Sequence, residues 1–260
     1  MTQGASYRRF VALGDSQTEG LDDLRADGSP RGWADRLAEQ LAATTSPGLR
    51  YANLAVRGCR ARHVHDVQLP RALDLAPDLA SVAVGMNDLL RHDYDLDATI
   101  EAIESTVVAL REAGAHVVSM TSPDVAKMLP VMGWLAGRQR AFHDRLREVH
   151  RRHGVPTLEL AGLPMGAARE LWAADRIHGS PEGHRRVAAG MARLLDLPGS
   201  DDSWSEVGPT RLRPVRLVAG EARWAATFLG PWLAGQVRRR PPGSEPVCKR
   251  PDLVEVTVER

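Results

Sequence analysis

Four short polar segments, far apart in the sequence, carry the residue types that an acyl-transfer reaction needs. They are Gly14-Asp15-Ser16, residues 53–58 (NLAVRG), residues 85–88 (GMND) and residues 175–178 (DRIH). A serine hydroxyl is a weak nucleophile at neutral pH, so it needs an imidazole to take its proton and an acid to fix the imidazole tautomer. It also needs hydrogen-bond donors for the oxyanion that forms on the attacked carbonyl. Together the four segments offer each of these parts.

Each segment taken alone is also typical of ordinary structure. Gly-Asp-Ser is a common turn composition, Asn87 suits an Asx turn, and Asp175 with His178 could be a pair on a surface loop. Their joint occurrence in this order favours a catalytic site. A non-catalytic binding module of the same architecture is disfavoured, because the serine, the asparagine and the histidine are all present.

The apolar periodicity predicts strands and helices in alternation. Short apolar runs predict strands at residues 9–13, 49–54, 79–84, 116–120 and 156–160, and spacings of three and four residues predict helices at 33–41, 97–113, 139–153 and 181–195. This order predicts parallel βαβ units, hence a sheet covered by helices on both faces. In such folds functional residues gather beyond the carboxyl ends of the strands. The loops at 14–20, 55–60 and 85–93 each follow a predicted strand, so we expect them at one edge of the sheet.

With these segments in this order, residues 8–197 resemble the SGNH hydrolases, also called GDSL-type esterases and lipases. The resemblance implies a flavodoxin-like α/β/α sandwich with a central parallel sheet, and a Ser-His-Asp triad that works through an acyl-enzyme intermediate. Ser16 would be the nucleophile, His178 the general base and Asp175 its orienting acid. The oxyanion hole would combine the backbone N–H groups of Ser16 and Gly58 with the side-chain amide of Asn87. The resemblance implies no metal and no cofactor.

Other polar residues near these segments are open to more than one interpretation. His184 is a competing base, but it falls inside a predicted helix and lacks an aspartate three residues earlier. Asp15 is expected to brace the serine turn, and Asp88 to order its own loop. Cys59 is expected to pack as a small side chain, although it could also perturb the site.

Two further patterns bear on metals and nucleic acids. His63, His65 and Asp66 have the residue types of a metal site, but solvated residues near the pocket are the preferred interpretation. The arginine clusters at 151–152 and 238–240 are local, and a formal net charge of +1 gives no overall field to attract nucleic acid. We therefore expect neither partner.

The composition is that of a soluble globular protein. The 260 residues are 43% hydrophobic and 26% charged. Cys59 and Cys248 make no disulfide framework, which favours a reducing compartment. The early apolar run at 10–13 is too short for a secretory signal, and no stretch approaches the roughly 20 apolar residues that span a bilayer. We expect a cytoplasmic protein without an integral membrane segment.

The resemblance implies acyl transfer without identifying the acyl group. A small-molecule acyl ester is the expected substrate, hydrolysed by water. The alternative is an acyltransferase that moves a short or medium acyl group to a sugar or polyol acceptor. The segment from Met128 to Leu135 could form an apolar wall for a short or medium acyl chain.

After residue 198 the alternation of predicted strands and helices ends. We expect a hydrolase domain at 1–198 and a helical or irregular C-terminal extension at 199–260. Within the extension, Trp224, Phe228 and Trp232 are spaced for one face of a helix at 220–236. Packing of this face on its own domain is preferred. A homodimer contact, a wall of the substrate pocket and, least favoured, interfacial membrane binding are the alternatives.

Overall fold

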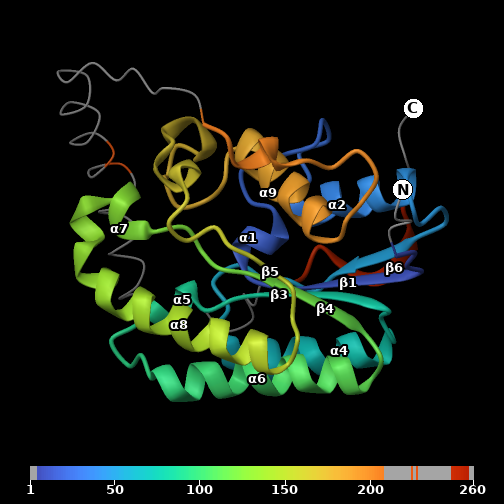
Figure 1. Cartoon of the computed structure of the whole chain (residues 1–260), viewed down its shortest axis with the longest axis horizontal. Helices are drawn as coiled ribbons and strands as arrows, with labels where there is room; N and C mark the ends of the chain where they lie inside the picture. The colour runs from blue at the N-terminus through green and yellow to red at the C-terminus, as the bar shows by residue number, and fades with distance from the viewer. Residues whose placement is uncertain (1–4, 208–223, 225–226, 228–246, 258–260) are drawn as a thin grey trace.

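One six-stranded sheet lies at the centre of the computed structural model, which describes residues 5–207, 224, 227 and 247–257 (Figure 1). The strands are β1 (Arg9–Gly14), β2 (Arg50–Asn53), β3 (Leu79–Ala83), β4 (His116–Met120), β5 (Thr157–Leu158) and β6 (Arg250–Glu255). Across the sheet their order is β5-β4-β3-β1-β2-β6. Strands β1 to β5 run parallel, and β6 runs antiparallel to β2. The order β2-β1-β3-β4-β5 is that of flavodoxin-like folds, which confirms the predicted fold class.

Helices cover both faces of the sheet (Figure 1). On one face lie α1 (Ser16–Glu19), α2 (Gly32–Ala43) and α9 (Pro181–Leu194). The other face carries α4 (Leu69–Asp74), α6 (Leu96–Glu112) and α8 (Ala136–Arg152), with α3 (Ala61–His63) and a π-helical turn, η1 (Val64–Gln68), leading into α4. Short elements complete the loops: α5 (Met86–Leu89), α7 (Val125–Met128), and the 3₁₀ turns η2 (Pro130–Leu135), η3 (Pro164–Ala167), η4 (Arg169–Leu171) and η5 (Asp202–Ser205).

Strand β1 shows how the sheet lies between two hydrophobic cores. Val11 and Leu13 belong to the core shared with α6 and α8, whereas Phe10 and Ala12 belong to the core shared with α2 and α9. Successive side chains of a strand point to opposite faces, and here both faces are covered. The strand is therefore continuously apolar.

The strands and helices predicted between residues 9 and 195 are confirmed, with shifts at their ends. The helix predicted at 139–153 begins earlier, at Ala136, and the strand predicted at 156–160 is reduced to the two residues of β5. Features such as the short helix α1 and strand β6 have no counterpart in the prediction. The first of these matters most for the site, because α1 begins at Ser16.

Strand β6 brings part of the C-terminal extension onto the sheet. Its Glu255 lies opposite Arg50 of β2, at the edge of the sheet. Just before the strand, the Lys249 ammonium donates to the carbonyl oxygens of Pro30 at 3.1 Å and Arg31 at 2.7 Å. The helix predicted at 220–236 lies outside the described residues except for 224 and 227. The division of the chain at residue 198 stays a prediction.

The described residues include no helix that is long and apolar enough to cross a membrane. Cys59 and Cys248 are free thiols. The cytoplasmic location stays a prediction.

Candidate active site

The turn after β1 presents Ser16 at the carboxyl edge of the sheet. Gly14 ends the strand, and a Cβ at this position would lie 2.5 Å from the carbonyl oxygen of Ala83 on β3. Only glycine allows this close approach. The Gln68 side chain fixes the Gly14 backbone twice, since its Oε1 accepts from the N–H and its Nε2 donates to the carbonyl, each at 2.9 Å. The residue before the Asp-Ser pair is thus held firmly in the sheet.

Helix α1 has only four residues and is held by side chains at both ends. Asp15 is its N-cap and accepts from the Gln17 N–H at 3.1 Å, so it braces the serine turn as expected. Asn53, at the end of β2, donates to the Thr18 carbonyl at 2.8 Å. A single helical turn has little stability of its own, so these bonds fix the place of Ser16.

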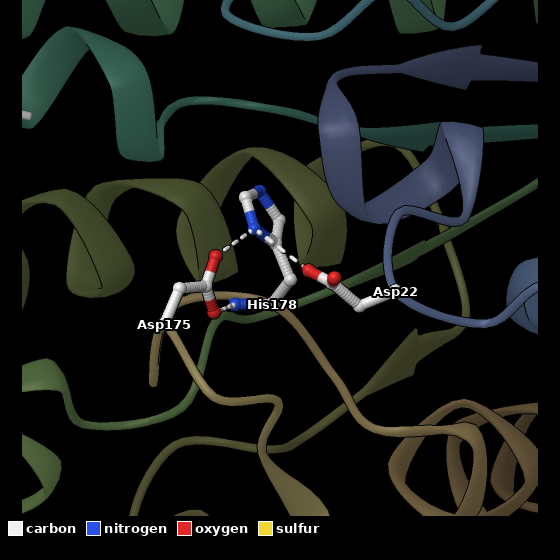
Figure 2. A group of neighbouring side chains, drawn as sticks. All are labelled: Asp22, Asp175 and His178. Carbon is white, nitrogen blue, oxygen red and sulfur yellow. Dashed lines mark hydrogen bonds and ion pairs between the residues drawn. The ribbon is translucent and has the colours of Figure 1, made fainter. Parts of the chain in front are cut away.

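Ser16, His178 and Asp175 form one hydrogen-bonded chain. His178 Nε2 lies 2.8 Å from Ser16 Oγ, and His178 Nδ1 lies 2.6 Å from Asp175 Oδ2. Figure 2 shows the Asp175 carboxylate directed at the ring nitrogen. In this geometry the Nδ1–H donates to Asp175, and the Nε2 lone pair accepts from the serine hydroxyl. The structure thus brings together groups 162 residues apart in the sequence.

Burial and charge act in opposite directions on the pair of His178 and Asp175. Burial lowers the pKa of His178, but the hydrogen bond and charge of Asp175, together with the charges of Asp22 and Asp15, outweigh it, so the pKa of His178 is raised above its ordinary value. Burial raises the pKa of Asp175, but the hydrogen bond and charge of His178, together with the backbone N–H groups of Ile177 and His178, outweigh it, so the pKa of Asp175 is lowered. The pair therefore favours an ionised carboxylate beside a histidine of increased basicity.

The loop that carries Asp175 and His178 is irregular and is held by hydrogen bonds. Asp175 Oδ1 accepts from the backbone N–H groups of Ile177 at 3.0 Å and His178 at 3.1 Å. Gln17 Nε2 donates to the Ile177 carbonyl at 2.7 Å, which joins the loop to α1. Trp224 Nε1 donates to the Asp175 carbonyl at 2.8 Å. Sequence reasoning missed these roles of Gln17 and Trp224, since nothing local marks a partner 160 or 49 residues away.

The three predicted oxyanion donors come from three separate loops. The Ser16 N–H is in the first turn of α1, where backbone N–H groups lack intrahelical partners. Gly58 lies in the turn after β2 with a φ of 76°. Asn87 lies on α5, after β3, and lines the same cavity as Ser16. Its Nδ2 donates to the Cys59 carbonyl at 3.0 Å and to Asp15 Oδ2 at 3.2 Å, which joins the three loops.

Two buried carboxylates connect these loops further. Asp88 accepts from the Ala61 N–H at 3.0 Å and from Arg60 Nε at 3.3 Å, so it ties α5 to the loop after β2. The sequence predicted that Asp88 orders its own loop, whereas these two bonds of its carboxylate go to the neighbouring loop. The second carboxylate is Asp15, which accepts from the Asn87 amide, and burial raises the pKa of Asp15 to about 6.

His184, the competing base, is occupied by backbone groups at both ring nitrogens. Its Nδ1 accepts from the Trp33 N–H at 3.2 Å, and its Nε2 donates to the Leu21 carbonyl at 3.0 Å. Burial lowers the pKa of His184 to about 4, so it is neutral near pH 7. Its lone pair is engaged, so it has no free acceptor for a serine proton.

The remaining candidates have structural explanations. His65 and Asp66 pair with each other at 2.7 Å on the surface, where Arg62 also binds Asp66 at 2.6 Å. The Cys59 thiol lies 3.1 Å from the Gly14 carbonyl, and burial raises the pKa of Cys59 well above its ordinary value. It therefore stays protonated and packs as a small side chain.

An apolar cavity of about 170 Å³ lies beside Ser16 and Asn87. Much of its wall is sulfur-containing or aromatic, from Met86, Met120, Met128, Met132, Met165, Phe142, Trp172 and Trp224. The segment predicted as an apolar wall contributes Met128, Leu129 and Met132, and the extension contributes Trp224. Methionine side chains adapt easily to the shape of a bound group.

A comparison with protein-family models identifies the family of the chain. Residues 12–186 match the model of the GDSL-like lipase/acylhydrolase family. The chain belongs to this family and is a carboxylic ester hydrolase, which confirms the resemblance to SGNH hydrolases. No curated protein matches the chain significantly.

Solved structures share the fold at low sequence identity. LAE5, an α/β hydrolase enzyme from the metagenome of Lake Arreo in Spain, has a TM-score of 0.62 at 20% identity, covering 75% of this chain and 98% of its own. A mutant of Axe2, an acetyl-xylooligosaccharide esterase from Geobacillus stearothermophilus, has a TM-score of 0.62 at 18% identity over 82% of this chain and all (100%) of its own. A catalytic mutant of Axe2, an acetylxylan esterase, has a TM-score of 0.63 at 17% identity, covering 80% of this chain and 100% of its own.

Proposed function

We propose that this protein hydrolyses carboxylic esters through an acyl-enzyme on Ser16, with His178 as general base and Asp175 as its orienting acid. The observation that carries the proposal is the continuous hydrogen-bonded chain, 2.8 Å from Ser16 to His178 and 2.6 Å from His178 to Asp175. The distances are those at which a proton can pass between nucleophile and base.

The reaction follows from the positions of these groups. Ser16 Oγ attacks the ester carbonyl while its proton moves to His178 Nε2. The tetrahedral intermediate then collapses, and Nε2 returns the proton to the leaving alcohol. Water repeats the sequence on the acyl-enzyme: it gives a proton to Nε2 and attacks the acyl carbon. The second tetrahedral intermediate collapses, Nε2 returns that proton to Ser16 Oγ, and the carboxylic acid leaves. Asp175 keeps the proton on Nδ1 throughout and faces the imidazolium that forms.

The oxyanion is stabilised by the N–H groups of Ser16 and Gly58 and by the Asn87 amide. Both protons of the Asn87 amide already have acceptors, Cys59 at 3.0 Å and Asp15 at 3.2 Å. We assign the longer bond, to Asp15, as the one exchanged for the oxyanion. The bond to Cys59 then keeps the amide in place during the reaction.

Axe2 supports these roles by likeness. It has been solved as catalytic mutants in which a serine, an aspartate or a histidine is replaced by alanine, and its aspartate and histidine have the Asp-x-x-His spacing of Asp175 and His178. Its substrates are acetylated xylan and xylooligosaccharides, as its names state.

The cavity supports an acyl group longer than acetyl. Its wall of methionine, leucine and aromatic side chains would remove alkyl carbons from water, and each buried CH₂ is worth about 0.8 kcal/mol. A short or medium alkyl chain is the class of acyl group that such a wall favours. We therefore propose a preference for acyl chains beyond acetate.

The same cavity favours a second candidate function, acyl transfer. An apolar wall beside the acyl-enzyme keeps bulk water from the acyl carbon, which lengthens the time in which an acceptor alcohol, such as a sugar or polyol, can react. The residues that act would be the same, and only the acceptor would differ.

Product analysis on a series of p-nitrophenyl esters, from acetate to laurate, tests both functions with wild-type protein and Ser16→Ala. Free acid and any acyl-glycerol or acyl-glucose are quantified together. Loss of turnover in Ser16→Ala with its fold intact supports the serine mechanism. The ratio of acid to transfer product separates hydrolase from transferase. A folded Ser16→Ala with wild-type activity would overturn the proposal, and best turnover of acetate would overturn the longer-chain preference.

A further inference from the structure

A second carboxylate faces the same nitrogen of His178 that Asp175 binds. Asp22 Oδ2 lies 3.6 Å from His178 Nδ1, and Asp175 Oδ2 lies 2.6 Å from it. Figure 2 shows the two carboxylates approaching the ring from different loops, one after α1 and one before α9. The shorter distance is a hydrogen bond, and the longer one is the distance of an ion pair.

The turn that presents Asp22 is fixed by its neighbours. The φ of Asp22 is 65°, a left-handed conformation that aspartate and asparagine tolerate better than most residues. On one side the Leu21 carbonyl accepts from His184 at 3.0 Å. On the other side the buried Asp23 carboxylate accepts from Arg36 Nε at 2.7 Å and Nη2 at 2.9 Å. The backbone of Asp22 is therefore held whether or not its side chain is charged.

We propose that Asp22 is a positioning residue whose carboxylate stabilises the protonated form of His178, while Asp175 holds the tautomer. This inference rests on the function proposed above, because it assigns Asp22 to the same base. When the serine proton reaches Nε2, the ring becomes a cation that faces two anions. The single Nδ1–H donates to Asp175, and Asp22 acts through its charge.

The other titratable groups around His178 are Asp175, Asp15 and His184, and none of them is altered by a substitution at position 22. The pKa of His178, lowered by burial, is raised by Asp175 first and then by the charges of Asp22 and Asp15. Asp15, on the turn after β1, has its pKa raised by burial to about 6, so its own charge changes in the range where the base titrates. His184, on α9, has its pKa lowered by burial to about 4 and stays neutral there. A comparison of variants at position 22 leaves these contributions unchanged.

The same three groups have the spacing of a cation site, since their ligand atoms lie within 4.8 Å of one another. The base role is incompatible with such a site. If Nε2 accepts from Ser16, the proton of the neutral ring is on Nδ1, and Nδ1 then has no lone pair for a metal. A cation bound there would remove the tautomer that the reaction needs.

Removal of the Asp22 charge is expected to act differently at low and high pH. Asp22→Asn keeps the size of the side chain and suits the positive φ. Without the carboxylate the pKa of His178 falls, so the base is neutral at lower pH and the acid limb of kcat/KM moves to lower pH. Above the limb, kcat/KM falls by about two- to fivefold, the range expected for a half-exposed ion pair. A merely structural defect would lower activity equally at every pH.

The experiment is a pH profile of kcat/KM on p-nitrophenyl butyrate for wild type, Asp22→Asn and Asp27→Asn. Asp27 is the matched control, because it lies on the same loop and its carboxylate accepts from Ser29 at 2.8 and 2.6 Å, away from the base. The acid limb should lie lower in Asp22→Asn than in the other two proteins. A limb that does not move, or a loss that is uniform with pH, would overturn the inference.

Two further arms keep the test decisive. Raising NaCl from about 0.05 M to about 1 M screens exposed charges, so it should move the wild-type limb downward and the Asp22→Asn limb less. An equal shift in both proteins would count against the inference. His178→Ala separates the two proposals: retained turnover would overturn the proposed function, whereas lost turnover with an unmoved limb in Asp22→Asn would overturn only the role of Asp22.

Discussion

The two ends of the hydrogen-bonded chain are held in different ways. Ser16 follows a central strand, and Gln68 binds both backbone groups of the preceding glycine at 2.9 Å. Asp175 and His178 lie on an irregular loop, which side chains such as Gln17 hold in place. The nucleophile is thus anchored by the end of a sheet strand as well as by side-chain hydrogen bonds. The base lies on a loop without such a strand, so its position depends more on individual hydrogen bonds, and single substitutions should shift it more easily.

On the sheet side, the largest effect is expected from Asn87→Ala. The loss of one oxyanion donor costs about 10²–10³ in kcat, because that donor acts mainly in the transition state. Steady-state kinetics check the result, and thermal unfolding checks that α5 keeps its place. Wild-type kcat in a folded Asn87→Ala would remove Asn87 from the oxyanion hole.

On the loop side, Gln17→Leu should lower kcat by about tenfold with little change in KM. The substitution removes the donor to the Ile177 carbonyl, 2.7 Å away, and a net loss of about 0.5–1.5 kcal/mol per hydrogen bond corresponds to roughly two- to twelvefold. The readout is steady-state kinetics on a series of esters that share one acyl group and differ in the acidity of the leaving group. An unchanged kcat would mean that the loop keeps its place without Gln17.

The smallest effect is expected from Trp224→Phe. Phenylalanine keeps an apolar ring against the cavity but cannot donate to the Asp175 carbonyl, which accepts from Trp224 at 2.8 Å. We expect about a threefold loss of kcat, within the range of one hydrogen bond. Trp224→Ala is the paired variant, and it should also change the preference for acyl chain length. Equal kinetics in all three proteins would show that Trp224 affects neither the loop nor the cavity.

The sequence was most informative where function depends on short local motifs. Ser16 after a strand, Asn87 after another, and the Asp-x-x-His spacing of Asp175 and His178 can all be read locally, and the parallel fold places strand ends at one edge. The alternation of apolar runs likewise predicted β1 to β5 and the long helices. These features depend on neighbours in the sequence.

The features that sequence reasoning missed depend on partners far along the chain. The side chain of Gln17 meets a carbonyl 160 residues later, and Asp22 meets His178 only because a left-handed turn directs it there. Strand β6 has a mostly exposed, partly polar sequence, RPDLVE, and it is a strand because it pairs with β2. No local periodicity marks such a strand.

The most direct test of the account is covalent labelling of the nucleophile. Wild type, Ser16→Ala and His178→Ala are each treated with diethyl p-nitrophenyl phosphate and measured as intact proteins by mass spectrometry, with the adduct located by peptide mapping. The account predicts a single diethylphosphoryl group on Ser16 in the wild type, none in Ser16→Ala, and much slower labelling in His178→Ala. Labelling of Ser16→Ala at the wild-type rate, or an adduct on another residue, would contradict it.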